Sequence, residues 1–498
     1  MDRRQHQMID RAIEDYWSGK VGRREFLRRL AVVGAGAALG LSILGDLACS
    51  PSLATPAQNE AQGSANLLAV PSAPPNILFV IIDTLRADHL SCYGYERTTT
   101  PNIDNLARQG VLFESAISTS SYTAPSHASL LTGRYPHEHG VQWITRRPVL
   151  DGRYLTLPEA LQARGYRTAA FSANRFWFTR EQGFGQGFSR FEDTFRSPVQ
   201  MAMRTVYGQQ IEDNIIKRVA EDYPWRTLAS GINRSALHWI KQDSSRPFFA
   251  FLNYFDVHDP YFPPGSYRGK YSARENPGGI VNSYQNRFNP EMTPQQVQEE
   301  IDAYDGAISY VDDHLARLLT QIRDLGAGDN LLVIITSDHG EAFGEHGTFL
   351  HPNSVYREEV HVPLVLWQPG RMPVEARVSQ PVSIAALPAT VMELIGQGGQ
   401  DVFPQPSLVR FWDSSTLPSD PYFPIAEMEH WPWMFASAPS SQGAMRSLVT
   451  PEYHYIEHDT LGDELYDWRH DPRELHNLAD TAEGQAKMDE LRRLFERI

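Results

Sequence analysis

Cysteine is nearly absent from this sequence of 498 residues, which contains only Cys49 and Cys92. A framework of several disulfides requires more cysteines than this, and so does a zinc site built from cysteine ligands. Neither is therefore expected. With 41% hydrophobic and 21% charged residues, the composition is that of a globular protein. Its length allows one large α/β domain and a smaller one.

Positive charge is also scarce. Lys and Arg total 45 against 60 Asp and Glu, which gives a formal net charge of −15. A protein of this charge is repelled by nucleic acid and by anionic membrane surfaces, so neither is expected as the main partner. A small anionic ester substrate remains compatible, because a local cationic site can exist on an acidic protein. The sequence leaves the oligomeric state open.

A hydrophobic run long enough for a stable membrane span is missing too. The best run, residues 30–47, is rich in Gly and Ala and marginal for crossing a bilayer. It follows RREFL, which begins at Arg23, and residues 1–48 together resemble a twin-arginine export signal. We expect a protein exported to the periplasm, the medium or the cell surface. Cys49 is a candidate lipid anchor, but Asp46 stands where a lipobox usually has Leu. The alternative is an ordinary signal peptide with an incidental cysteine.

Residues 49–75 have the Ala, Pro, Ser, Gln and Asn composition of a flexible linker. Five apolar runs without polar alternation follow, as expected for parallel strands buried on both faces; they span residues 76–83, 168–174, 247–255, 331–338 and 362–367. Helical patterns lie between them, for example at 101–109 and 301–325. This alternation predicts a doubly wound, mostly parallel α/β sheet over residues 76–420.

Residues 421–498 have a different pattern. Short strand-like pieces such as SLVTPEYHYIEH and ELYDW precede a charged amphipathic helix, EGQAKMDELRRLFERI. We expect a small α+β C-terminal subdomain with one sheet and one helix, packed on the main sheet.

Polar side chains gather directly after four of the five apolar runs. They are Asp83, Asn174, Asp256 with His258, and Asp338 with His339. In open α/β sheets the ligand crevice lies outside the carboxyl ends of the strands. The sequence therefore predicts a functional site at this edge of the sheet.

The stretch SYTAPSHASLLTG, which begins at Ser121, is typical of a loop that enters a helix. Pro125 suits a first helical turn, and the N-terminus of a helix attracts phosphate or sulfate groups. Two interpretations of Thr123 remain open. Thr123, or Ser126, caps the helix, or Thr123 is a nucleophile that needs a base or a metal ion to act.

A metal site follows from the polar strand ends. Asp83, Asp338 and His339 supply two carboxylates and one imidazole, and an oxygen of Thr123 would complete four ligands. A divalent ion there would lower the pKa of the hydroxyl and polarise an anionic substrate oxygen. Oxygen ligands suit calcium or magnesium, whereas the imidazole favours manganese or zinc. From spacing alone, SDHG is equally consistent with a polar turn after a strand.

From about residue 76 to the C-terminus, the chain resembles the sulfatases of the alkaline-phosphatase superfamily. Six segments match in family order: NILFVIIDTLRADHLSCYGY, TTPNIDNLARQGVLFESA, TAPSHASLLTGRYPHEHGV, NYFDVHDPYFPP, TSDHGEAFGEHG and ELYDWRHDPRELHNLA. The resemblance implies an alkaline-phosphatase-like α/β fold and a divalent metal ion. It also implies hydrolysis of sulfate or phosphate esters.

The resemblance assigns the metal ligands position by position. Asp83 and Asp338 match family ligands. His339 takes the place of the usual Asn, or of the His found in phosphoester-cleaving relatives. Thr84 falls where calcium sulfatases usually have a second Asp, so one expected ligand is missing.

The resemblance also assigns the groups that contact the substrate. His258 matches the His that contacts the substrate oxyanion or the leaving group, and His351 falls on the leaving-group side. His127 replaces the Arg that usually follows PS, and Asn174 aligns with the family's Lys–His segment. With Thr123, these four residues are the candidate catalytic residues.

Thr123 is the main departure from the family pattern, because it stands where sulfatases carry the Cys or Ser that is converted to formylglycine. A formylglycine hydrate expels sulfate by eliminating back to the aldehyde. Thr is not converted, so an intermediate on Thr123 must be hydrolysed at sulfur or phosphorus. Phosphothreonine intermediates occur in relatives within the superfamily. For this protein we therefore expect phosphate monoesters or diesters as substrates rather than sulfate esters.

Two other functions remain as alternatives. A phospho-group transferase would use the same Thr123, but its relatives usually carry a bundle of membrane helices. A non-catalytic exported binding protein would have kept the fold alone. The retention of the metal ligands and candidate catalytic residues argues against it.

Overall fold

The computed structural model describes residues 73–142, 149–193, 226–273, 292–398, 402–412, 422–432, 434 and 436–496. All of these belong to one compact unit, Ala65–Asp193 with Arg226–Ile498. The predicted export signal, Cys49 and most of the predicted linker lie outside the described residues. In the described part of the chain, we find no helix with the length and apolar character needed to cross a membrane.

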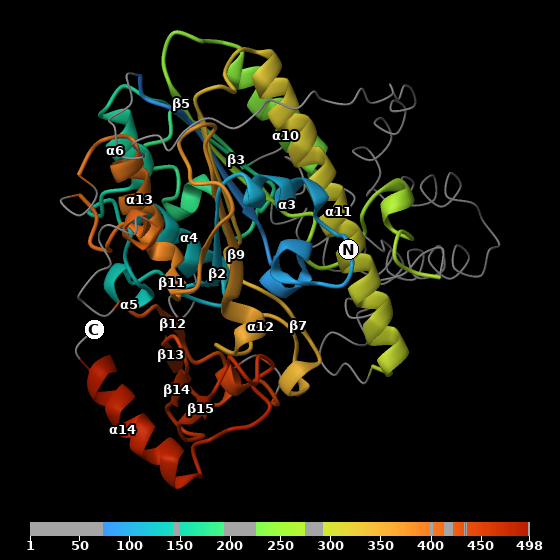
Figure 1. Ribbon diagram of the computed structural model, residues 1–498, viewed down its shortest axis with the longest axis vertical. Helices are drawn as coiled ribbons and strands as arrows, with labels where there is room; N and C mark the ends of the chain where they lie inside the picture. The colour runs from blue at the N-terminus through green and yellow to red at the C-terminus, as the bar shows by residue number, and fades with distance from the viewer. Residues whose placement is uncertain are drawn as a thin grey trace, which may run out of the picture. The chain divides into compact units, whose positions relative to one another are not determined.

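A nine-stranded mixed sheet forms the centre of this unit (Figure 1). In spatial order its strands are β10 (Ala376–Val378), β2 (Val111–Ile117), β9 (His361–Trp367), β6 (Leu331–Thr336), β1 (Asn76–Ile82), β5 (Phe248–Tyr254), β3 (Arg167–Ser172) and β4 (Arg190–Glu192), with β11 (Val382–Ser383) also paired to β2. The five predicted apolar runs form β1, β3, β5, β6 and β9, which confirms the predicted α/β fold class.

The prediction was wrong for the direction of β9 and omitted β2. β9 pairs antiparallel with both β6 and β2, whereas β1, β3, β5 and β6 are parallel to one another. The chain leaves β6 at the carboxyl edge of the sheet and reaches β9 through short elements, so β9 runs back across the sheet. A wholly apolar run marks burial on both faces but carries no information on strand direction.

Alternate residues of β1 enter two different cores. Ile77, Phe79 and Ile81 belong to one hydrophobic cluster, and Leu78 and Val80 belong to the other. Helices α4 (Thr123–Thr132), α6 (Leu157–Gln162) and α13 (Leu387–Leu394) cover the first face (Figure 1). The second face is covered by α3 (Pro101–Arg108), α10 (Ala229–Ile240) and α11 (Pro294–Asp324). Burial on both faces explains why the strands show no polar alternation.

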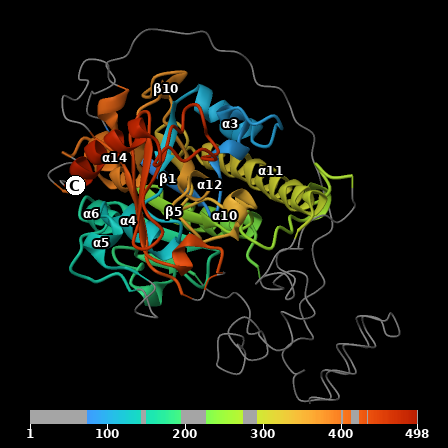
Figure 2. The same ribbon diagram turned by 90° about the horizontal axis from the view of Figure 1, so that it is seen from below.

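A second, antiparallel sheet follows the main one. It contains β12 (Ile425–Met428), β13 (Met445–Val449), β14 (His454–His458) and β15 (Glu464–Tyr466), and α14 (Ala482–Phe495) packs on it (Figure 2). A shared hydrophobic cluster joins Ile117 and Val360 of the main part to Met428 and Ile456 of this sheet. The predicted small C-terminal sheet and helix are thus present.

The pairing register brings the predicted site residues together. Ile81 of β1 pairs with Thr336 of β6, so Asp83 and Asp338 both follow two residues later at the same edge of the sheet. Both parallel strands point their carboxyl ends toward this edge, where ligand sites form in open α/β sheets.

Candidate active site and metal centre

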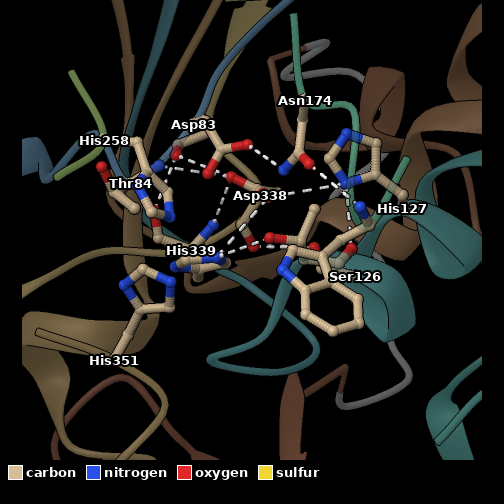
Figure 3. A network of polar contacts seen from close by, with 12 residues as sticks. Asp83, Thr84, Ser126, His127, Asn174, His258, Asp338, His339 and His351 are labelled. Atoms are coloured by element: carbon tan, nitrogen blue, oxygen red, sulfur yellow. Dashed lines mark hydrogen bonds and ion pairs between the residues drawn. The ribbon is translucent and has the colours of Figure 1, made fainter. Parts of the chain in front are cut away.

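Asp83, Asp338 and His339 form a buried cluster at the carboxyl ends of β1 and β6 (Figure 3). One ligand atom from each residue lies within 4.8 Å of the others. All three side chains are inaccessible to solvent. The predicted metal ligands therefore meet in one place, and the sheet register is what brings them together.

The cluster has the chemistry of a divalent cation site. Asp83 Oδ1 and Asp338 Oδ2 are buried and accept no hydrogen bond from the residues that the structure describes. Burial, reinforced by the charge of Asp338, raises the pKa of Asp83 well above its usual value. A bound cation would offset the repulsion between these two carboxylates. The donor set of two carboxylates and one imidazole suits a divalent cation.

His339 contributes a neutral imidazole to the cluster. Its Nδ1 lies 2.9 Å from the carbonyl oxygen of Gly340, to which it donates, so that Nε2 carries the lone pair. Burial lowers the pKa of His339 to about 4, even though the Asp338 carboxylate acts in the opposite direction. A neutral imidazole with this tautomer is the form that binds metal ions.

Thr84 does not replace the missing second carboxylate. Its backbone has a φ of 60°, in the left-handed region, and its hydroxyl donates to the carbonyl oxygen of Val257 at 3.2 Å. Its backbone N–H faces Asp338 Oδ1 at 3.4 Å. The hydroxyl of Thr84 thus points at the loop after β5. Thr84 therefore does not supply the ligand that the second Asp supplies in calcium sulfatases.

Thr123 is the first residue of α4, and its hydroxyl lies 3.2 Å from Nε2 of His339. The N-cap residue is Tyr122, which makes no side-chain cap hydrogen bond. Ser126 donates instead to the carbonyl oxygen of Asp338 at 2.7 Å. The cap interpretation of Thr123 and Ser126 is therefore wrong. Pro125 does occupy the first turn of the helix, as predicted.

His127 and Asn174 lie on one side of the two carboxylates, opposite His258 and His351 (Figure 3). Nδ1 of His127 donates to the carbonyl oxygen of Thr123 at 2.9 Å, and its ring packs 4.3 Å from that of Phe178. Burial lowers the pKa of His127, so the ring is neutral. The amide of Asn174 donates to Asp83 Oδ2 at 2.9 Å. His127 thus holds the main chain of Thr123, and Asn174 holds the carboxylate of Asp83.

His258 lies on the other side of the cluster with a carboxylate at its back. Its Nδ1 lies 2.9 Å from Asp259 Oδ1, and its ring stacks on Phe255 with centroids 4.1 Å apart. Burial alone would lower the pKa of His258, but the charge and hydrogen bond of Asp259, together with the charges of Asp83 and Glu341, outweigh it and the pKa rises to about 9. His258 is therefore protonated at neutral pH and can stabilise negative charge or donate a proton.

The loop that carries His258 is held by a single guanidinium group. Arg226 donates to the main-chain carbonyl oxygens of residues 255, 256, 258, 259 and 260, at 2.8–3.4 Å. In return, Asp256 Oδ1 accepts the backbone N–H of Ala229 at the start of α10. This exchange fixes the position of the loop relative to the sheet.

His351 completes the site beside His339 and His258. Its ring centroid lies 4.3 Å from that of His339 and 4.9 Å from that of His258. Nδ1 of His351 lies 2.7 Å from Glu341 Oε1. Every candidate residue from the sequence thus falls in or directly against one cluster.

A pocket of about 530 Å³ opens beside the start of α4. Its lining includes the aromatic residues Tyr122 and Trp431 and the carboxylates of Glu427 and Glu429. The rings of Tyr122 and Trp431 lie 5.1 Å apart between centroids. This space adjoins the helix that begins with Thr123 and is large enough for a small organic group.

Sequence reasoning missed two residues that support the site, Glu341 and Arg226. Glu341 belongs to the segment TSDHGEAFGEHG and stands two residues after the ligand His339, which was a usable signal. Arg226 lies in a stretch with no recognisable pattern. Its role depends on a loop that only the folded chain brings near it.

Comparison with known proteins identifies the family. The sequence model of the Sulfatase family matches residues 75–397. Among curated proteins, an uncharacterized sulfatase, YidJ of Escherichia coli strain K12, is 26% identical over 435 residues, which cover 82% of this chain and 83% of that protein. The sequence match thus spans the strands, the α4 loop and the ligand cluster.

Solved structures share the fold. BT4656, solved with its substrate D-glucosamine-2-N,6-O-disulfate, superimposes with a TM-score of 0.67 at 19% identity, covering 85% of this chain and 97% of that one. The phosphonate monoester hydrolase of Agrobacterium radiobacter gives a TM-score of 0.66 at 20% identity, covering 85% and 95%. The chain therefore belongs to the sulfatase family of the alkaline-phosphatase superfamily and is a hydrolase of sulfuric or phosphoric esters.

Proposed function

We propose that this hydrolase cleaves phosphate monoesters or diesters with Thr123 as its nucleophile, and that it hydrolyses sulfate esters less efficiently. One observation carries the proposal. The hydroxyl of Thr123 lies 3.2 Å from Nε2 of His339, beside two buried carboxylates, in the first turn of α4. The position of this threonine hydroxyl beside the candidate metal ligands supports its role as the group that attacks phosphorus.

The proposed cofactor is one divalent metal ion held by Asp83, Asp338 and His339. When bound, such an ion would lower the pKa of the Thr123 hydroxyl and offset charge on the ester oxygens. The N-terminus of α4, which begins at Thr123, would attract the same anionic oxygens. An anionic ester is thereby favoured at a site on an acidic protein.

The reaction proceeds in two displacements. The Thr123 hydroxyl releases its proton to water and Oγ1 forms a bond to phosphorus while the bond to the alcohol oxygen breaks; that oxygen takes a proton from His258 or His351. Water then attacks the phosphorus, releases inorganic phosphate and restores the Thr123 hydroxyl. His127 and Asn174 hold Thr123 and Asp83 in place throughout.

The preference for phosphorus rests on the chemistry of threonine. A formylglycine hydrate can release sulfate without attack at sulfur, and Thr123 has no such route. Its ester must therefore be opened at the central atom. The fold neighbours include the phosphonate monoester hydrolases of Agrobacterium radiobacter and Silicibacter pomeroyi, which supports a site that accepts phosphorus.

The test uses purified protein with magnesium, calcium, manganese or zinc. Four p-nitrophenyl substrates are compared: the phosphate, the bis-phosphate, the phenylphosphonate and the sulfate. We expect turnover of a phosphorus ester. Thr123→Ala should lose at least about 1000-fold in kcat, because the nucleophile is missing, whereas Thr123→Ser should keep measurable activity.

Two results would overturn the proposal. Equal activity in Thr123→Ala would remove Thr123 from the nucleophilic role. Efficient hydrolysis of the sulfate alone would reverse the preferred substrate class. Mass spectrometry of acid-quenched protein should find phosphate on Thr123. If the group passes to an added sugar alcohol in preference to water, the enzyme is a transferase.

A further inference from the structure

We propose that Glu341 is a positioning residue that orients His351 for proton delivery to the leaving oxygen of the ester. This inference rests on the function proposed above and deepens it by assigning one of the two imidazoles a support. No motif of the sequence had singled out Glu341. Its place in the structure is what points to this role.

The contact between the two side chains is short and enclosed. Glu341 Oε1 lies 2.7 Å from Nδ1 of His351; the carboxylate is fully buried and the imidazole is 9% exposed. A carboxylate that accepts the Nδ1 proton fixes both the tautomer and the rotation of an imidazole ring. The second nitrogen, Nε2, is then the atom that exchanges a proton at the reaction site.

The ring fixed in this way lies at the reaction site. It stands 4.3 Å from the ring of the metal ligand His339 and 4.9 Å from that of His258, measured between centroids (Figure 3). A rotation of His351 about its side-chain bonds would carry Nε2 away from both neighbours. Holding this rotation at one angle is therefore a requirement for proton transfer.

Glu341 is itself held from several sides. Its second oxygen, Oε2, accepts the hydroxyl of the buried Tyr261 at 2.8 Å. Its backbone N–H donates to the carbonyl oxygen of Glu358 at 3.1 Å, and its own carbonyl oxygen accepts Nη1 of Arg86 at 2.9 Å. A carboxylate restrained in this way can impose an orientation on its partner.

The proton balance of the step is simple. As the bond between phosphorus and the alcohol oxygen breaks, that oxygen takes the proton from Nε2 of His351. The proton on Nδ1 stays shared with Glu341, so His351 leaves the step neutral. The Thr123 hydroxyl releases its own proton to water when it attacks, and His351 regains an equivalent proton from water; in the second displacement one proton of the attacking water restores the Thr123 hydroxyl.

The alternative is that Glu341 only stabilises the fold. Glu359 offers a matched comparison, because it is also fully buried and binds the segment directly after His351. Glu359 accepts the backbone N–H of Asn353 at 2.8 Å and the hydroxyl of Ser354 at 2.9 Å, with no imidazole as its partner. A purely structural carboxylate should therefore behave as Glu359 does.

The experiment compares an alkyl phosphate with p-nitrophenyl phosphate. An alkoxide needs a proton to leave, whereas p-nitrophenolate leaves without one. Glu341→Ala should lower kcat on the alkyl ester about 100-fold and change kcat on the p-nitrophenyl ester by less than about 3-fold. Glu341→Gln keeps an acceptor oxygen and should recover most of the loss. The control Glu359→Gln should change both substrates by the same factor.

A double-mutant cycle tests whether Glu341 acts through His351. In the His351→Ala background, Glu341→Ala should cause no further loss on the alkyl ester. Equal losses on the two substrates, failure of Glu341→Gln to recover activity, or a full additional loss in the double mutant would each overturn the proposal. Thermal melts of both Glu341 variants check that they are folded.

A separate readout distinguishes this inference from the proposed function. If the wild-type protein turns over no ester, the proposed function fails, and imidazole nitrogen NMR of the metal-loaded protein decides the role of Glu341. We expect Glu341→Ala to change the nitrogen shifts of His351 toward those of a mixed tautomer. Unchanged shifts would overturn the role even if the enzyme were active.

Discussion

At the scale of single residues, two opposing effects determine the pKa of His258. Burial disfavours its charged form, whereas the Asp259 carboxylate, 2.9 Å from Nδ1, and the charges of Asp83 and Glu341 favour it; together they prevail and the pKa rises to about 9. His258 is therefore protonated below about pH 9 and loses its proton as the pH rises through that value. Proton donation by His258 should follow the same limit.

This gives a prediction for Asp259→Asn. Without the charge and hydrogen bond of Asp259, burial is opposed only by weaker charges such as those of Asp83 and Glu341, and the pKa of His258 falls. The basic limb of the pH profile of kcat/KM should therefore move to lower pH, by about one to two units. A pH–rate profile from pH 5 to 10 measures the shift. Asp324→Asn, at the exposed end of α11, removes an equal charge far from the site and serves as the control. An unmoved basic limb would exclude His258 as the titrating acid.

The sequence predicted the site residues better than it predicted their partners. Asp83, Asp338 and His339 were recognisable because each follows an apolar strand, and strand ends meet at one edge. Arg226 was not, because its contacts depend on how a loop folds back on the sheet. Glu341 stands in a matched segment, but nothing in the sequence indicates that His351 is its partner. Side chains that act through another residue leave no periodic pattern in the sequence.

At the scale of elements, the loop after β6 is attached by its backbone to α12 (Arg357–Val360). The N–H of Gly340 donates to the carbonyl oxygen of Glu359 at 2.8 Å. A Cβ atom at Gly340 would lie 2.0 Å from the carbonyl oxygen of Glu358, which is backbone and cannot rotate away. The close approach explains why glycine stands between His339 and Glu341.

Gly340→Ala should therefore push this loop away from α12. We expect a loss of about 1–3 kcal/mol in the free energy of unfolding, together with weaker metal binding, because His339 moves with the loop. Urea denaturation and metal titration measure the two effects. Gly231→Ala is the control, since a Cβ there meets only Thr227 Cγ2, at 3.4 Å, and should leave both values nearly unchanged. Wild-type metal affinity in Gly340→Ala would contradict this account.

The prediction of strands was correct where burial on both faces determines the sequence pattern. It was wrong about strand direction, which the connection between two strands determines. β1, β5 and β6 were found because both their faces are covered, by α4 and its neighbours on one side and α10 and α11 on the other. β9 has the same apolar character and the opposite direction. Its direction is set by the route of residues 337–360 along the carboxyl edge, which no local pattern records.

At the scale of the whole molecule, the metal ligands join two neighbouring central strands, β1 and β6, at one end. These strands contribute to the cores on both faces of the sheet. In the absence of a cation, the buried carboxylates of Asp83 and Asp338 repel each other, and the pKa of Asp83 is raised by burial and by that repulsion. Metal binding should thus stabilise the entire fold.

Chelation of the metal is therefore expected to lower the melting temperature. At a free metal concentration 100-fold above its Kd, binding contributes about 2.7 kcal/mol to the free energy of unfolding. Thermal melts with and without EDTA measure the difference. Asp83→Asn removes a ligand and the repulsion together, so its melting temperature should hardly respond to EDTA. An equal response in wild type and Asp83→Asn would place the metal elsewhere.

The hydroxyl of Thr123 at the first turn of α4 has a consequence for how the enzyme reaches its working state. A formylglycine exists only after another enzyme has modified the chain, whereas a threonine side chain is complete at translation. On the function proposed here, folding and uptake of one metal ion are enough to complete the catalytic site. The gene alone, expressed in a cell that has no modifying enzyme for sulfatases, would then yield a competent catalyst.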